Sequence, residues 1–78
     1  MTEEVCFYKY EVYYYDCLDD KIRYSVGEVI GSSFEEACAR VVKYFGEPAI
    51  ESVSIEWIEG TECGVYVVED FVHEEGER

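Results

Sequence analysis

Alternating hydrophobic and polar positions in the first third of the chain predict a β-hairpin. Nearly every residue from 5 to 15 is apolar or aromatic, and the even positions form an unbroken apolar face. A turn-type segment at 16–20 follows, and residues 21–26 then alternate polar and apolar, which is typical of a half-buried antiparallel partner. Continued alternation would bury a glutamate, so we expect a bulge or bend at Gly27 that turns Val29 inward.

The hydrophobic period changes to about 3.6 residues in the middle of the chain, which predicts one amphipathic helix. Ser33 and Glu36 have the spacing of a capping box, in which side chains satisfy free amides at a helix start. Ser32 with Glu35 is an equally spaced alternative. Gly46, with a proline two residues later, ends the helix. The stripe expected to face the core consists of Phe34, Ala37, Cys38, Val41, Val42 and Phe45.

Two more strands are expected after the helix. Residues 53–57 alternate again, and Gly60 marks a turn. Residues 65–72 are typical of a final strand, although both of its faces are apolar, so either both are partly covered or one is a binding surface. The segment 73–78 is expected to be a frayed acidic tail.

The predicted fold is a single α+β domain over residues 1–72 with the order ββαββ. Its antiparallel four-stranded sheet carries one helix packed on one face. A helix of about twelve residues is only about 18 Å long and can cover just that face, which leaves the other for water or a partner. The sheet residues expected beneath the helix are Tyr10, Val12, Tyr24, Val26, Val53, Ile55 and Trp57.

Charge separates this chain from most small folded domains. Its 78 residues include 19 acidic and 6 basic side chains, for a net charge of −13, yet 49% of them are hydrophobic and 17% aromatic. Chains that stay disordered through charge are poor in such residues, so this one should fold. Between Lys43 and Arg78 there is no lysine or arginine but there are ten acidic residues. Such a surface repels nucleic acid and anionic membranes and attracts basic proteins.

The sequence contains no recognisable catalytic or cofactor motif. It has a single histidine and lacks the nucleophile-elbow, P-loop and dinucleotide-binding patterns, so we expect no enzyme and no cofactor. Asp16, Asp19 and Asp20 lie close together but lack the calcium-loop pattern, and we interpret them as a solvated turn rather than a metal site.

The four cysteines, at positions 6, 17, 38 and 63, have no metal-binding spacing. Residues 1–4 have neither the basic start nor the apolar stretch of a secretion signal, and no apolar run is long enough to span a membrane. We therefore expect reduced thiols in a soluble cytoplasmic protein, with a chance surface disulfide or a redox role as the alternative for the cysteines.

The eight tyrosines cannot all be buried in so small a core. Tyr13 and Tyr15 lie on the odd face of the first strand, beside charged residues, and tyrosine is a preferred anchor in protein interfaces. Strand-rich chains also use tyrosine simply as a β-former. Charge and exposure reasoning gives these candidate partner-binding residues: Tyr13, Tyr15, Asp16, Asp19, Asp20, Glu56, Glu59, Glu62, Glu69 and Asp70.

In its small size, acidity, element order and surface tyrosines, the chain resembles the acidic inhibitors of phages and mobile elements, including DNA-mimic and anti-CRISPR proteins. The resemblance implies a non-enzymatic inhibitor whose carboxylates stand in for phosphates in the nucleic-acid site of a nuclease or CRISPR-type effector subunit. It also implies that the protein acts in a bacterial host cell if a phage encodes it. The alternative is an immunity- or antitoxin-like binder, or a homo-oligomeric adaptor, such as a homodimer, that uses the uncovered sheet face.

Overall fold

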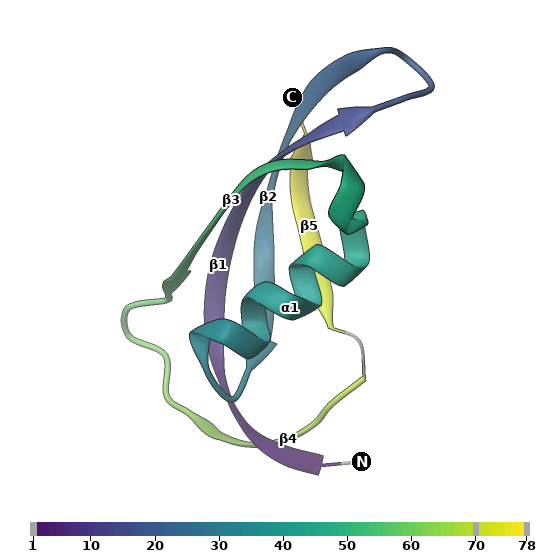
Figure 1. The fold of residues 1–78 in the computed structure, drawn as a ribbon. Helices are drawn as coiled ribbons and strands as arrows, with labels where there is room; N and C mark the ends of the chain where they lie inside the picture. The colour runs from purple at the N-terminus through teal and green to yellow at the C-terminus, as the bar shows by residue number, and fades with distance from the viewer. Residues whose placement is uncertain (1, 70, 78) are drawn as a thin grey trace.

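The described residues form an α+β domain with one α-helix on an antiparallel sheet (Figure 1). The computed structural model describes residues 2–69 and 71–77, with side chains described to residue 74. Its elements are β1 (Thr2–Asp16), β2 (Lys21–Gly31), α1 (Phe34–Phe45), the short 3₁₀ helix η1 (Glu47–Ala49), β3 (Ile50–Trp57), β4 (Gly64–Val67) and β5 (Val72–Glu77). The strand order is β3-β1-β2-β5, and β4 pairs with the start of β1.

The single strand expected at 65–72 is two strands with different partners. β4 pairs with residues 2–5 of β1, whereas β5 pairs with β2 at the opposite edge of the main sheet. This explains why no single face could be assigned from the sequence, since the two halves face different surroundings. β5 also replaces most of the frayed tail expected from His73 onward.

The register of β2 corrects the predicted core. Tyr10 lies opposite Gly27 in an unbroken β1–β2 ladder, so the odd positions of β2 face the helix, and Tyr24 and Val26 face away from it. A Cβ at Gly27 would lie 2.7 Å from the Tyr10 hydroxyl oxygen, so the glycine makes room for that ring. The expected bulge is absent from this ladder, but the β2–β5 register shifts between Val26 and Gly27.

The main core lies between α1 and β1, β2 and β3. Its buried cluster comprises Tyr8, Tyr10, Val12, Val29, Ala37 and Val41. Val53 and Ile55 pack against this cluster from β3, as predicted. Trp57 remains 45% exposed and Phe34, at the start of the helix stripe, 53% exposed. Both lie at the rim of the core, where the ring of Phe34 contacts that of Tyr8 with their centres 4.9 Å apart.

The predicted helix ends are confirmed. The Ser33 hydroxyl accepts a hydrogen bond from the backbone N–H of Glu36 at 3.2 Å. At the other end, Gly46 has φ 91°, a left-handed conformation that suits glycine, and its N–H donates to the carbonyl of Val42 at 2.8 Å. The Glu36 carboxylate accepts instead from the Ser32 hydroxyl and from Arg40, so both candidate serines take part in the cap.

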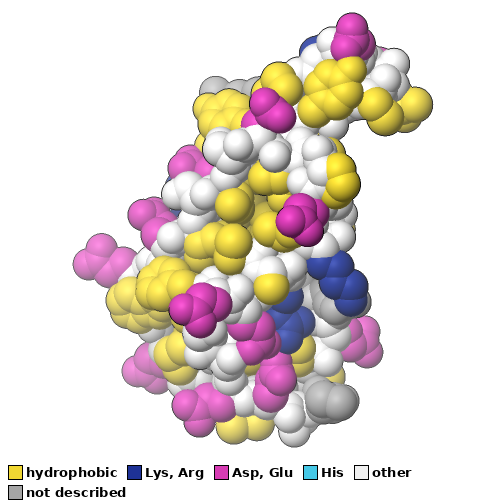
Figure 2. All heavy atoms as spheres, in the orientation of Figure 1, with side chains coloured by type: hydrophobic (Ala, Val, Ile, Leu, Met, Phe, Trp, Pro, Cys, Tyr) yellow, Lys and Arg dark blue, Asp and Glu magenta, His cyan; other side chains and the backbone are white. Residues whose placement is uncertain are grey.

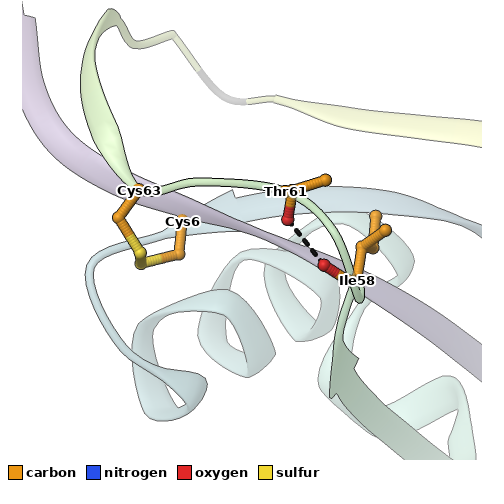
Figure 3. The surroundings of a disulfide bond; sticks show 4 residues. All are labelled: Cys6, Ile58, Thr61 and Cys63. Carbon is orange, nitrogen blue, oxygen red and sulfur yellow. Dashed lines mark hydrogen bonds between the residues drawn. A yellow bond between two sulfur atoms is a disulfide. The ribbon is translucent and has the colours of Figure 1, made fainter.

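A disulfide joins Cys6 and Cys63, which corrects the expectation that all four cysteines are reduced (Figure 3). Val5 pairs with Gly64 in the β1–β4 ladder, so the next position of that ladder places the two cysteines opposite each other. Their Cα atoms are 4.2 Å apart. The contact depends on β4 docking and has no signature in cysteine spacing. The other two cysteines, at 17 and 38, are free thiols as expected.

Candidate protein-binding face

The sheet face opposite α1, which we call the open face, carries the main candidate binding residues. Directly opposite residues of an antiparallel ladder share a face, so the register identifies its members. They are Lys9, Glu11, Tyr13 and Tyr15 of β1, Ile22, Tyr24, Val26 and Glu28 of β2, and Ser52, Ser54 and Glu56 of β3. Toward the start of β1 this face is covered, because Tyr66 packs on the ring of Phe7 with centroids 5.1 Å apart.

The β1–β2 hairpin projects beyond the helix (Figure 1) and exposes hydrophobic side chains (Figure 2). The rings of Tyr13 and Tyr24 lie 4.9 Å apart, and the Tyr24 hydroxyl donates to Oε1 of Glu11 at 2.6 Å. Tyr13 is 48% exposed and Tyr15 40% exposed. A shallow hollow beside these rings is lined by Tyr13, Ile22, Arg23 and Tyr24. The two predicted tyrosines therefore lie on an accessible and partly preorganised surface.

Ile22 and Tyr24 belong to this surface but were missed by the sequence analysis, which assigned their alternation to the core. The pattern is the same for either face of a strand, and only the register with β1 decides between them. The small residues Ser25 and Gly27, which lie beneath the helix, were the feature of the sequence that could have indicated which face of β2 is buried. Gly27 lies opposite the large side chain of Tyr10 and Ser25 lies opposite Val12, and small residues at these positions fit a packed interior.

The hairpin turn holds three predicted acids, and each is engaged inside the turn. Arg23 Nε donates to Asp16 Oδ2 at 2.6 Å, and its other end pairs with Asp19. The Tyr15 hydroxyl donates to Asp20. The hydrogen bond from Arg23 lowers the pKa of Asp16, and the bond to Asp20 raises the pKa of the Tyr15 hydroxyl. These acids order the turn, and the single positive charge of Arg23 offsets one of their three negative charges.

The other predicted acids lie elsewhere on the molecule. Glu56 is on the open face of β3, Glu59 and Glu62 are exposed in the loop after it, and Glu69 is exposed between β4 and β5. Asp70 lies outside the described residues. Since β3 runs from Ile50 at the hairpin end to Trp57 beside Tyr8, the loop acids are roughly 25 Å from the hairpin turn. The structure therefore does not bring the two acidic groups together.

Two basic side chains outside the hairpin turn, those of Lys9 and Arg40, lie beside acidic side chains. Lys9 lies in register between Glu28 and Glu56 on the open face. Arg40 on α1 is held between Glu3 and Glu36, each at 2.8 Å. The hydrogen bond from Ser32, followed by that from Arg40, lowers the pKa of Glu36 to about 2. Because the net charge of the protein is −13, the electrostatic potential around it is negative.

The described residues contain no cluster of three His, Cys, Asp or Glu side chains that could hold a metal ion. None of the described helices is long and apolar enough to cross a membrane. Comparisons with protein-family models, curated proteins and solved structures found no significant match.

Proposed function

We propose that this protein is a non-enzymatic inhibitor that occupies a basic nucleic-acid-binding surface on another protein, such as a nuclease or a CRISPR-type effector subunit. The observation that carries the proposal is the open face itself. It places the tyrosine rings at 13 and 24 beside the carboxylate of Glu11 on an uncovered sheet of an acidic protein.

The chemistry of such a face matches that of a nucleic-acid strand. Carboxylates present negative charge to the lysine and arginine side chains that otherwise bind phosphates. Tyrosine rings offer π-faces on which arginine stacks, as it does on bases. The negative field also accelerates encounter with a basic partner, and this effect weakens as salt is added.

The apolar end of the hairpin favours a second candidate function, an immunity- or antitoxin-like binder or a homo-oligomeric adaptor. Tyr13, Ile22 and the tip residue Leu18 are 48%, 48% and 92% exposed. With the turn acids engaged by Arg23 and Tyr15, this end could bury against an apolar surface, and such binding depends little on salt.

Immobilised protein presented to a bacterial lysate at low and high salt tests these functions against each other. Mimicry requires that the captured partner bind DNA or RNA, that salt release it, and that excess oligonucleotide displace it from this protein. A partner that binds nucleic acid and this protein at the same time, without interference, would exclude mimicry. Capture of a small basic toxin would support the immunity function, and self-association alone would support the adaptor.

A further inference from the structure

The outer edge of β3 is an unpaired strand edge among the described residues, because β3 is the terminal strand of the sheet. One hydrogen bond fixes which backbone groups point outward: the Ile58 N–H donates to the Phe7 carbonyl at 3.1 Å, toward β1. In an antiparallel ladder this direction alternates from residue to residue. Residues 52, 54 and 56 therefore bond toward β1, and the N–H and C=O groups of Val53, Ile55 and Trp57 point outward.

The two sides of this edge differ in chemistry. On the open face it carries Ser52, Ser54 and Glu56, and on the helix side Val53, Ile55 and Trp57. The two serine side chains are small, so they leave a shallow groove, which we call the serine row, between the edge of β3 and the larger side chains of Tyr13 and Glu11 on β1. Neighbouring strands are about 4.8 Å apart, so a long basic side chain from an added strand can lie across that row.

The edge is limited at the hairpin end by a change in register. Tyr13 pairs with Ser52 but Tyr14 pairs with Ile50, which leaves Glu51 as the extra residue of a bulge. Bulges interrupt ladder pairing, so the regular edge runs from Ser52 to Trp57.

We propose that this edge pairs, antiparallel, with an extended segment of a basic partner in which basic and apolar residues alternate. This inference rests on the proposed function and specifies how the partner is held. Basic side chains lie over the serine row and Glu56, apolar side chains lie beside Val53, Ile55 and Trp57, and the outward backbone groups continue the sheet. A second copy is disfavoured as the occupant because each copy carries a net charge of −13.

A synthetic strand tests the pairing directly. The probe is a capped, fluorescently labelled peptide of about seven residues in which arginine and valine alternate. In antiparallel pairing the valines lie opposite the outward groups of β3, so their N–H groups make the new bonds, while the arginine N–H groups point away. N-methylation of the valine amides should abolish binding of the probe. N-methylation of the arginine amides should change the dissociation constant by no more than about two-fold, a difference of about 0.4 kcal/mol.

Two charge-reversal variants of the protein test whether the acid on the open face of β3 contributes to binding of the probe. Glu56→Lys should weaken binding of the probe about five-fold or more, whereas Glu35→Lys, at an exposed acid on α1, should change it little. Hydrogen exchange should slow at the amides of Val53, Ile55 and Trp57 on adding the probe. Equal binding by all three peptides, or protection of the hairpin instead of β3, would overturn the proposal. Protection of these amides by concentration-dependent dimerisation alone would also overturn it.

The same reagents separate this inference from the proposed function. If oligonucleotide displaces a captured partner, but neither Glu56→Lys nor the probe affects its binding, the edge pairing is wrong and the mimicry stands. If the probe binds the edge and the captured partner never contacts nucleic acid, the inhibitor function fails while the edge pairing holds.

Discussion

Cys6 and Cys63 continue the β1–β4 ladder one position beyond the pair Val5–Gly64, and their disulfide links residues 57 positions apart. Together with the ring contact between Phe7 and Tyr66, it fastens the segment after β3 to the beginning of the chain. A bond that closes so long a loop removes much of the freedom of the unfolded chain.

Replacing both bridged cysteines by serine should therefore lower the free energy of unfolding by about 2–4 kcal/mol. Urea denaturation of the variant and of the oxidised parent measures this difference. Cys17→Ser, at an exposed free thiol in the hairpin turn, is the control and should leave stability nearly unchanged. Thiol titration of the unfolded parent should give two reactive groups before reduction and four after it. Four groups without reductant would show that the bridge does not form.

Gly27→Ala should destabilise the protein by about 1–3 kcal/mol, because the new Cβ would overpack a tight contact. It would lie 2.0 Å from the carbonyl oxygen of His73, a backbone atom of β5 that can move only with its strand. Gly64→Ala is the control, since the nearest atoms to its Cβ would belong to the side chain of Tyr66, at 3.2 Å or more. Hydrogen exchange should quicken first in β5. If Gly27→Ala melts like the parent, the pairing of Gly27 with β5 is wrong.

Val41→Asp should prevent folding, because Val41 is completely buried in the cluster under α1 and an unpaired carboxylate would enter the main core. Ala39→Asp places the same charge on the exposed side of the same helix and should fold. Circular dichroism during thermal melting distinguishes the two variants. A cooperative melt of Val41→Asp at the parental temperature would contradict the packing of the helix.

Glu36→Gln should reduce stability at neutral pH and have little effect in strong acid. Hydrogen bonds from Ser32 and Arg40 lower the pKa of Glu36 from 4.5 in the unfolded reference to about 2. A lowered carboxyl pKa stabilises the fold above the unfolded value, and this contribution is lost as the pH falls through the folded value. The difference in unfolding free energy between variant and parent should therefore shrink between about pH 4.5 and pH 2. Glu35→Gln removes a neighbouring exposed carboxyl and is the control at neutral pH for the loss of one charge at the helix start.

The parts of the fold that sequence predicts well are those set by local chemistry. The helix from Phe34 to Phe45, with its serine cap and Gly46 stop, depends on spacing and capping within one segment, and the structure confirms it. The apolar even face of β1 is likewise continuous over residues 6–14 and leaves little choice of orientation.

The parts that failed depend on contacts between distant segments. The face of β2 is decided by pairing Tyr10 with Gly27, and the disulfide by pairing β4 with the start of β1. For the candidate site, sequence could identify exposed Tyr13 and a surplus of acid. It could not show that Arg23 already holds Asp16, because that pairing depends on the hairpin register.

Tyr13→Ala should weaken binding to a captured basic partner by about 1–2 kcal/mol, mainly through faster dissociation. The ring of Tyr13 is 48% exposed yet rests against Tyr24, whose hydroxyl is held by Glu11, so little side-chain freedom is lost when a partner covers it. Tyr15→Ala should act in the same direction.

Tyr44→Ala is the matched control because that ring is 56% exposed on α1, on the other side of the sheet. Surface plasmon resonance at two salt concentrations separates this loss from electrostatic steering, which acts on the association rate. Equal losses for Tyr13→Ala and Tyr44→Ala would mean that the open face is not the binding surface.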